Sequence, residues 1–425
     1  MIVSKEMEFG GRPLTIEVGK VAKQADGAAW VRYGDTVVVA TAVSARERAE
    51  HTDFFPLTVD YREMKYAGGQ IPGGFFKREA RPRDKETLIA RMTDRPIRPL
   101  FPKGYYYETQ VLIRVYSHDG ENEGDIPGAL ASSVALMTSD IPFESPIATV
   151  IVGRIDGEFV INPTTEQLHD CEIQLMVAGT EDAITMVEGE AKEVSEDLFL
   201  EALDFAHDNI KTLIAFQKEV IEEFGQKPTR EWEAVLTPEE ISQAVREEAE
   251  ARVDEIVQIQ DKAERKSAQS ALKDELLEKL TERFPEQEKY IGAAMGELVK
   301  EKMRRNVLDK KVRLDGRGTK DIRDITIETG LLPRVHGSSL FTRGQTQSLG
   351  SATLGTREDE QKIDDLEGTY WKTFMLHYNF PPFCVGEVRR IGGPGRRELG
   401  HGHLAERSIK ALLPAWESFP YTIRV

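Results

Sequence analysis

The sequence predicts an α+β protein in which two related, strand-rich cores are separated by an all-α segment. Three observations support this prediction: strand patterns lead into helix patterns over residues 1–225, residues 237–310 have a helical composition, and residues 311–425 repeat the N-terminal pattern. The 425-residue chain is 40% hydrophobic and 30% charged, which is typical of a globular protein with more than one hydrophobic core. We therefore expect mixed sheets with packed helices in both cores.

The first core, residues 1–225, begins with strands joined by turns. "LTIEV" (14–18) alternates apolar and polar residues, and "TVVVATA" (36–42) is rich in β-branched residues. Asp156-Gly157 stands where the two-residue turn of a hairpin is expected, and residues 172–189 read as a further hairpin.

Helical spacing appears in two stretches of the first core and then dominates residues 237–310. In the core it covers Ile126–Met137 and Ser195–Phe224, and Ser195 is expected to be the N-cap of the second helix. In the middle segment, Thr237 is expected to cap a helix that starts at Pro238. The Glu, Lys, Ala and Leu content favours a charged, solvated bundle, while a long coiled coil is left open although sustained heptads are missing.

The C-terminal segment repeats the first core with small insertions and deletions. "GAAWVRYGDT" (27–36) matches "GSSLFTRGQT" (337–346) in its glycine spacing, and "GGFFKRE" (73–79) matches "GGPGRRE" (392–398). We call residues 1–225 copy one and residues 311–425 copy two. Copy one continues for about 110 residues beyond the valine that is equivalent to Val425, so we expect the chain to be truncated within its second domain.

Charge is distributed unevenly along this acidic chain. The net charge is −17, yet residues 70–105 hold nine Lys or Arg against four Asp or Glu, and residues 388–410 hold six against two. Two cysteines are too few for a disulfide framework or a CxxC zinc site, which favours a reducing compartment. We see no apolar run long enough to span a membrane and no targeting segment, so we expect a cytoplasmic protein.

The glycine-rich stretch 392–407 has the composition of an anion site. Its glycines permit close approach, and the guanidinium groups of Arg396 and Arg397 suit bidentate contact with phosphate oxygens. A Walker A loop is excluded because no Gly-Lys-Ser/Thr follows. Two alternatives stay open: a metal site at His401 and His403, and a turn whose arginines pair with Glu398 and Glu406.

The basic stretch of copy one combines rings with cations. Phe75 and Phe76 precede Lys77 and Arg78, a composition suited to single-stranded nucleic acid, since bases stack on rings while cations follow the backbone. Burial of both rings in the core is the alternative, but adjacent bulky residues cannot both point inward from a strand, so a loop is favoured. Downstream, Arg91, Arg95 and Arg98 would form a cationic helical stripe that either contacts RNA, or is a solvated face or forms ion pairs with neighbouring copies of the chain.

In this order the motifs "GGFFKRE", "RLDGR" (313–317) and "GGPGRRELGHG" resemble the bacterial polynucleotide phosphorylases of the RNase PH family over the whole chain. The resemblance implies tandem RNase PH-like cores, a homotrimeric ring that threads single-stranded RNA, and reversible phosphorolysis from the 3′ end during mRNA degradation. Residues 75–78 would grip RNA, and Arg396, Arg397 and His401 would lie at the active site.

The resemblance also implies cofactors and partners. Inorganic phosphate would be the co-substrate, and Mg²⁺ or Mn²⁺ would be held by carboxylates that are expected beyond Val425. An endonuclease or a helicase of an RNA-degrading complex would accompany the enzyme. The alternatives are a single-core RNase PH that trims tRNA, which the duplication disfavours, and a non-catalytic RNA-binding ring or scaffold subunit.

Overall fold

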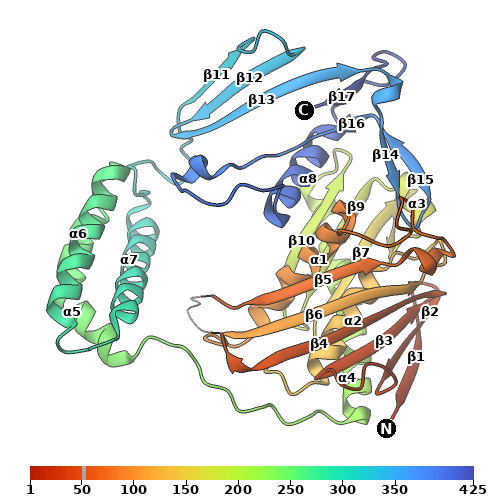
Figure 1. The fold of residues 1–425 in the computed structure, drawn as a ribbon, viewed down its shortest axis with the longest axis horizontal. Coiled ribbons are helices and arrows are strands. Elements are labelled where there is room, and N and C mark those ends of the chain that lie inside the picture. The colour runs from red at the N-terminus through yellow and green to blue at the C-terminus, as the bar shows by residue number, and fades with distance from the viewer. Residues whose placement is uncertain (50–53) are drawn as a thin grey trace. The chain divides into compact units, whose positions relative to one another are not determined.

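The computed structural model describes residues 1–49 and 54–425, which divide into two compact units (Figure 1). Unit 1 comprises Met1–Ala234 and Ala352–Val425, and unit 2 comprises Val235–Ser351. The domain boundaries expected from the sequence remain a prediction. Among the described residues, none of the helices is both long and apolar enough to cross a lipid bilayer.

The larger sheet of unit 1 has six strands in the order β1-β2-β3-β4-β6-β5. Neighbouring strands run antiparallel except β5 and β6, which are parallel. Alternate residues of β3, such as Ala29 and Val31, are buried, as the period of a strand with one covered face requires. The strands are β1 (Val3–Phe9), β2 (Arg12–Val18), β3 (Gly27–Tyr33), β4 (Thr36–Arg48), β5 (Leu57–Glu63) and β6 (Tyr107–Ser117).

The second sheet of unit 1 is four-stranded, in the order β10-β9-β7-β8. Asp156 and Gly157 turn the β7–β8 hairpin with φ angles of 51° and 87°, which confirms the predicted two-residue turn. The predicted hairpin over residues 172–189 is also confirmed, by β9 and β10. The strands are β7 (Ala148–Ile155), β8 (Glu158–Ile161), β9 (Ile173–Gly179) and β10 (Ile184–Ala191), with α3 (Thr165–Asp170) before β9.

Two helices pack in the layer between these sheets (Figure 1). α2 (Asp125–Met137) contacts β3 and β4 on one side and β7 on the other, so its residues after Asp125 are all buried. α4 (Glu196–Phe224) packs against β1, β7 and β9. Ser195 caps α4 by accepting a hydrogen bond from Leu198 N at 3.2 Å, as predicted.

Copy two has the strand order β11-β12-β13-β17-β16, which repeats the order β2-β3-β4-β6-β5 of copy one. In both copies only the last pair is parallel, so the duplication is confirmed at the level of topology. The strands are β11 (Ile325–Thr329), β12 (Gly337–Arg343), β13 (Thr346–Gly355), which runs across the boundary of the two units, β16 (Phe374–Met375) and β17 (Thr422–Arg424).

Shorter elements complete unit 1. The β14–β15 hairpin (Gln361–Asp364 and Thr369–Lys372) stands between β13 and β16. Helix α1 (Asp84–Ile97) precedes β6, and α8 (Arg396–Lys410) precedes β17, so each helix has the same place in its copy; the two helices also pack on each other. The 3₁₀ helices are η1 (Lys65–Gly68), η2 (Arg98–Leu100), η3 (Arg357–Asp359) and η4 (Pro382–Val385).

Unit 2 contains a helical bundle of α5 (Glu239–Ile256), α6 (Lys262–Leu280) and α7 (Glu288–Lys310) around one apolar core. The predicted start of α5 is wrong. Pro238 has extended φ and ψ angles of −57° and 139° and is itself the N-cap, so the helix begins at Glu239 and Thr237 lies outside it. The carbonyl of Pro238 accepts the first bonds, from Ile241 N and Ser242 N.

Candidate functional site

The loop at residues 75–78 presents two aromatic rings and two cations to solvent. Phe75 and Phe76 are 93% and 87% exposed, and their rings meet edge to face with centroids 5.5 Å apart. Within residues 1–49 and 54–425, the side chains of Lys77 and Arg78 form no ion pair or hydrogen bond. The predicted loop is therefore confirmed, and the alternative that both rings are buried in the core is wrong.

Arg396 and Arg397 are the first two residues of α8 and differ in their contacts. Arg396 Nη2 donates to the carbonyl oxygen of Val59 in β5 at 2.7 Å, so this side chain is anchored on the first sheet. Arg397 is exposed and has no hydrogen-bond or ion-pair partner in the described part of the chain. The positive end of the helix dipole and the guanidinium of Arg397 together form a local surface that favours an anion.

The alternative in which these arginines pair with nearby carboxylates is wrong. Glu398 accepts hydrogen bonds from the backbone N–H groups of Phe380 and Gly395, both at 2.8 Å. Glu406 pairs with Lys372 at 2.6 Å. Neither carboxylate neutralises Arg397, so its charge stays available.

The two histidines of the glycine-rich stretch lie inside a helix. The ring of His401 meets the ring of Tyr378 at a centroid distance of 5.4 Å, and burial, followed by the charge of Arg407, lowers the pKa of His403. Among the described residues, no group of three or more His, Cys, Asp or Glu side chains is placed to hold a metal ion, so the metal alternative has no support here.

Gly400 and Gly402 in α8 serve packing rather than anion binding. A Cβ atom on Gly400 would lie 2.7 Å from Arg91 Nε, and one on Gly402 would lie 3.4 Å from Tyr378 Cβ. Both glycines are buried, so α8 approaches its neighbours closely at these points.

The structural counterpart of Arg397 in copy one is Lys85, not Arg78. In α8, Glu398 bonds back to Gly395 N and to Phe380 N; in α1, Glu86 bonds back to Arg83 N at 2.7 Å and to Glu63 N at 2.8 Å. Because the two glutamates make the same contacts, Lys85 and Arg397 are the residues that precede them. The sequence match of "GGFFKRE" with "GGPGRRE" therefore does not pair structurally equivalent residues. Residues 75–78 belong to the loop before α1, which is longer than the corresponding loop before α8.

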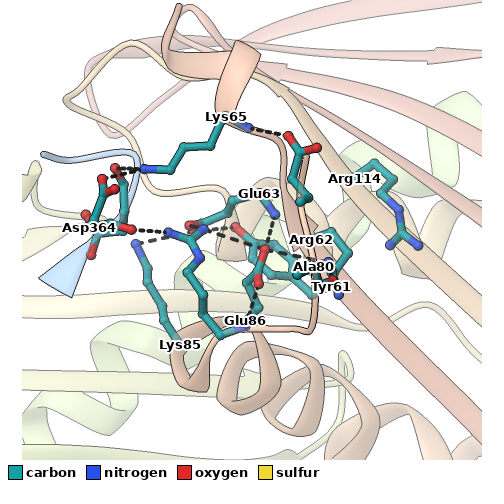
Figure 2. Close-up of polar contacts among 12 residues, drawn as sticks. Tyr61, Arg62, Glu63, Lys65, Ala80, Lys85, Glu86, Arg114 and Asp364 are labelled. Carbon is teal, nitrogen blue, oxygen red and sulfur yellow. Dashed lines mark hydrogen bonds and ion pairs between the residues drawn. The ribbon is translucent and has the colours of Figure 1, made fainter. Parts of the chain in front are cut away.

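Lys85 is surrounded by carboxylates, unlike Arg397. Its Nζ lies 3.3 Å from Glu63 and 2.8 Å from Glu123, and it also bonds to Glu367 of the β14–β15 hairpin. Figure 2 shows Lys85, Glu63 and Glu86 converging at the start of α1. Burial lowers the pKa of Lys85, but the carboxylates of Glu123, Glu63 and Glu367 outweigh it, so the pKa lies well above its ordinary value. An additional anion would gain nothing at this position, because three carboxylates already neutralise the cation.

The tip of the β14–β15 hairpin is held by copy one. Lys65 Nζ binds Asp364 at 2.7 Å and donates to the carbonyl of Asp365 at 2.9 Å (Figure 2). Leu366 is 6% exposed and packs into the main apolar core of unit 1. Apolar burial and ion pairs thus join copy one to copy two at this hairpin.

Arg91, Arg95 and Arg98 face a cavity of about 470 Å³ that Arg396 and Glu188 also line. Arg98 pairs with Asp94 at 2.8 Å and donates to the Phe55 carbonyl at 2.8 Å. Arg95 lies 3.4 Å from Glu188. The stripe predicted from the sequence is therefore present, and Arg95 and Arg98 form ion pairs within the chain, whereas contact with RNA or with neighbouring copies stays a prediction.

Sequence reasoning missed Lys85, Glu86 and Glu398. The signal was available: each glutamate stands three residues after the residue that precedes its helix, which is the spacing of a capping box. Aligning the two copies on that spacing, instead of on the glycine pairs, would have matched Lys85 with Arg397.

The chain matches family models over most of its length. Residues 10–142 and 321–425 match the 3′ exoribonuclease family, domain 1, and residues 145–209 match domain 2 of that family. Residues 240–318 match the polyribonucleotide nucleotidyltransferase RNA binding domain.

Curated relatives carry the name polyribonucleotide nucleotidyltransferase. The chain is 52% identical to that of Geotalea uraniireducens and 50% identical to that of Syntrophotalea carbinolica, in each case over 99% of this chain. It is 48% identical to that of Chlorobaculum parvum over the whole length of this chain. The chain spans 60% of the length of each of these relatives. Since one family model alone covers more than half of its residues, in two separate copies, the chain belongs to the 3′ exoribonuclease family.

Proposed function

We propose that this protein is a 3′-to-5′ phosphorolytic exoribonuclease that shortens mRNA with inorganic phosphate as co-substrate. One observation carries the proposal: Arg397 at the start of α8 is exposed and has no ion pair with any described residue, whereas its counterpart Lys85 faces three carboxylates. Copy two therefore offers an anion a site that copy one does not. Similarity to polyribonucleotide nucleotidyltransferases supports the same reaction.

In this reaction an oxygen of inorganic phosphate forms a bond to the phosphorus of the last phosphodiester in the RNA. The bond from that phosphorus to the 3′ oxygen of the penultimate nucleotide breaks. That oxygen takes up a proton, and the terminal nucleotide leaves as a nucleoside diphosphate; the reverse reaction extends the RNA. Both reactants are anions, so Arg396, Arg397 and His401 would act by orienting the phosphate groups and offsetting their charge.

We propose that the loop at residues 75–78 holds the single-stranded part of the RNA. Exposed rings at Phe75 and Phe76 offer stacking faces, and Lys77 and Arg78 offer charges to the backbone. A base stacked on one ring contributes about 1 to 3 kcal/mol without regard to sequence, as a processive exonuclease requires.

Further features extend the proposal by family resemblance. They are a homotrimeric ring, an endonuclease or helicase as partner, and a cytoplasmic location. Magnesium or manganese also belongs to the resemblance, but the described residues include no suitable ligand cluster, and we assign no step to a metal.

The test is product analysis with the full-length protein. End-labelled oligo(A) is incubated with magnesium, with and without inorganic phosphate, and the products are separated. Nucleoside diphosphates that appear only with phosphate are the expected result. Monophosphates formed without phosphate would indicate a hydrolytic nuclease, and RNA binding without any product would indicate a scaffold; either result would overturn the proposal.

A further inference from the structure

Glu398 closes the loop before α8, which carries the first glycines of the glycine-rich stretch. Its Oε1 accepts from Phe380 N and its Oε2 accepts from Gly395 N, each at 2.8 Å. These two backbone groups lie at the two ends of the loop over residues 380–395. One carboxylate therefore ties the strand side of the loop to the residue before α8.

Copy one contains the same pair of glutamate-to-backbone hydrogen bonds, but there the glutamate is buried. Glu86 bonds to Glu63 N at 2.8 Å (Figure 2) and to Arg83 N at 2.7 Å. The Glu86 side chain is buried, at 3% exposed. Glu398 is much less buried, yet it keeps both bonds. Burial of the carboxylate is thus not the reason for the contact; what the two sites share is the fixed start of a helix.

At the start of α8 this fixation acts on two arginines. Arg396 is held from the other side by the Val59 carbonyl at 2.7 Å, and the side chain of Arg397 is exposed, with no hydrogen bond or ion pair in the part of the chain that the structure describes. We propose that Glu398 is a positioning residue, which sets the first turn of α8 so that the guanidinium groups of Arg396 and Arg397 meet the phosphate. This inference rests on the proposed function and adds to it the residue that orders the site.

Because Glu398 is charged, the inference can be tested by whether its replacement weakens or strengthens phosphate binding. A carboxylate next to an anion site repels phosphate, so removing its charge would by itself strengthen phosphate binding. Loss of positioning has the opposite effect. The backbone N–H groups of Gly395 and Phe380 hold the pKa of Glu398 below its usual value, so the residue is charged throughout the working pH range.

The experiment compares Glu398→Gln and Glu398→Asp with the wild type in the full-length protein. Gln has one acceptor oxygen for two N–H groups, and Asp keeps the charge but is shorter by one methylene. We expect both variants to raise the KM for inorganic phosphate by about tenfold, which corresponds to about 1.4 kcal/mol, with a smaller change in the KM for RNA. Glu387→Gln is the matched control, because Glu387 is an exposed carboxylate in the same loop whose side chain makes no hydrogen bond among the described residues.

A KM for phosphate that falls in Glu398→Gln and stays unchanged in Glu398→Asp would overturn the inference, because it would reveal a purely electrostatic role. An equal rise in Glu387→Gln would overturn it as well. If the wild type shows no phosphorolysis, the proposed function fails, and the same variants are then compared by calorimetric titration with inorganic phosphate. Weaker binding in both variants would still support positioning, whereas a wild type that binds no phosphate would refute it.

Discussion

Replacing Lys85 by methionine is expected to destabilise unit 1 by about 2 to 3 kcal/mol at pH 7. The substitution keeps most of the length of the side chain but leaves Glu63, Glu123 and Glu367 without their shared cation. Breaking one partner out of a fully buried ion pair costs about 3 to 5 kcal/mol. The exposed side-chain fractions here are 27% for Lys85, 2% for Glu63, 17% for Glu123 and 23% for Glu367, so solvent reduces that cost.

The assay is urea unfolding followed by tryptophan fluorescence. All four tryptophans of the chain, at positions 30, 232, 371 and 416, lie in unit 1, so the signal reports on that unit alone. Below about pH 5 the stability lost by Lys85→Met should shrink, because carboxylates without a cation take up protons. Adding Glu123→Gln to Lys85→Met should restore part of the loss, since one repelling charge is removed.

Lys103→Met is the control for this prediction. Lys103 is exposed and has no ion pair among the described residues, so its replacement should change the free energy of unfolding by less than about 0.5 kcal/mol. If Lys85→Met behaved like this control at pH 7, or lost the same stability at about pH 4 as at pH 7, the reasoning about the buried carboxylates would be refuted.

Three further predictions concern other residues. Burial raises the pKa of Asp125 from 3.8 to about 6, so the folded state binds a proton more tightly than the unfolded state does. The free energy of unfolding of unit 1 should therefore fall as the pH rises from about 4 to about 6, by at most about 3 kcal/mol. Asp125→Asn should remove this decline in a pH series of urea unfolding, and an unchanged slope would contradict the assignment. Ser195→Ala should cost about 1 kcal/mol because Leu198 N loses its cap, and Ser195→Asp should retain most of that stability; an equal loss in both would exclude capping as the cause. Phe76→Ala should leave the unfolding curve unchanged, because the ring is 87% exposed, but should weaken oligo(A) binding by roughly five- to 150-fold in fluorescence anisotropy; unchanged affinity would remove this ring from the proposed RNA contact.

Local patterns were sufficient for much of the fold. The turn at Asp156-Gly157 was predictable because only a few residue pairs favour positive φ at both positions, and the Ser195 cap was predictable because hydroxyls favour that site. The exposure of Phe75 and Phe76 followed from their adjacency and from the glycines beside them. The start of α5 was missed because proline is over-represented at the first helical position, whereas Pro238 occupies the N-cap, one residue before it.

The candidate site was less predictable, because its residues are distant in sequence. Arg396 was identified from composition, but its anchor on the Val59 carbonyl depends on how β5 and α8 pack. The match of Arg78 with Arg397 failed because the loop before α1 is longer than the loop before α8. Similarity between two short motifs does not show that the loops containing them have the same length.

The amino-acid sequence alone was enough to establish the duplication, the helical middle segment and the two basic stretches, because periodicity, glycine spacing and charge are properties of neighbouring residues. Which cation stays free was decided by tertiary structure. Lys85 and Arg397 are both cations at the start of a helix, but packing brings Glu63, Glu123 and Glu367 into ion pairs with the first, whereas no described carboxylate forms an ion pair with the second. Electrostatic character depends on distance in space, so Glu367, which is 282 positions from Lys85 in the sequence, helps to determine what this lysine of copy one can bind.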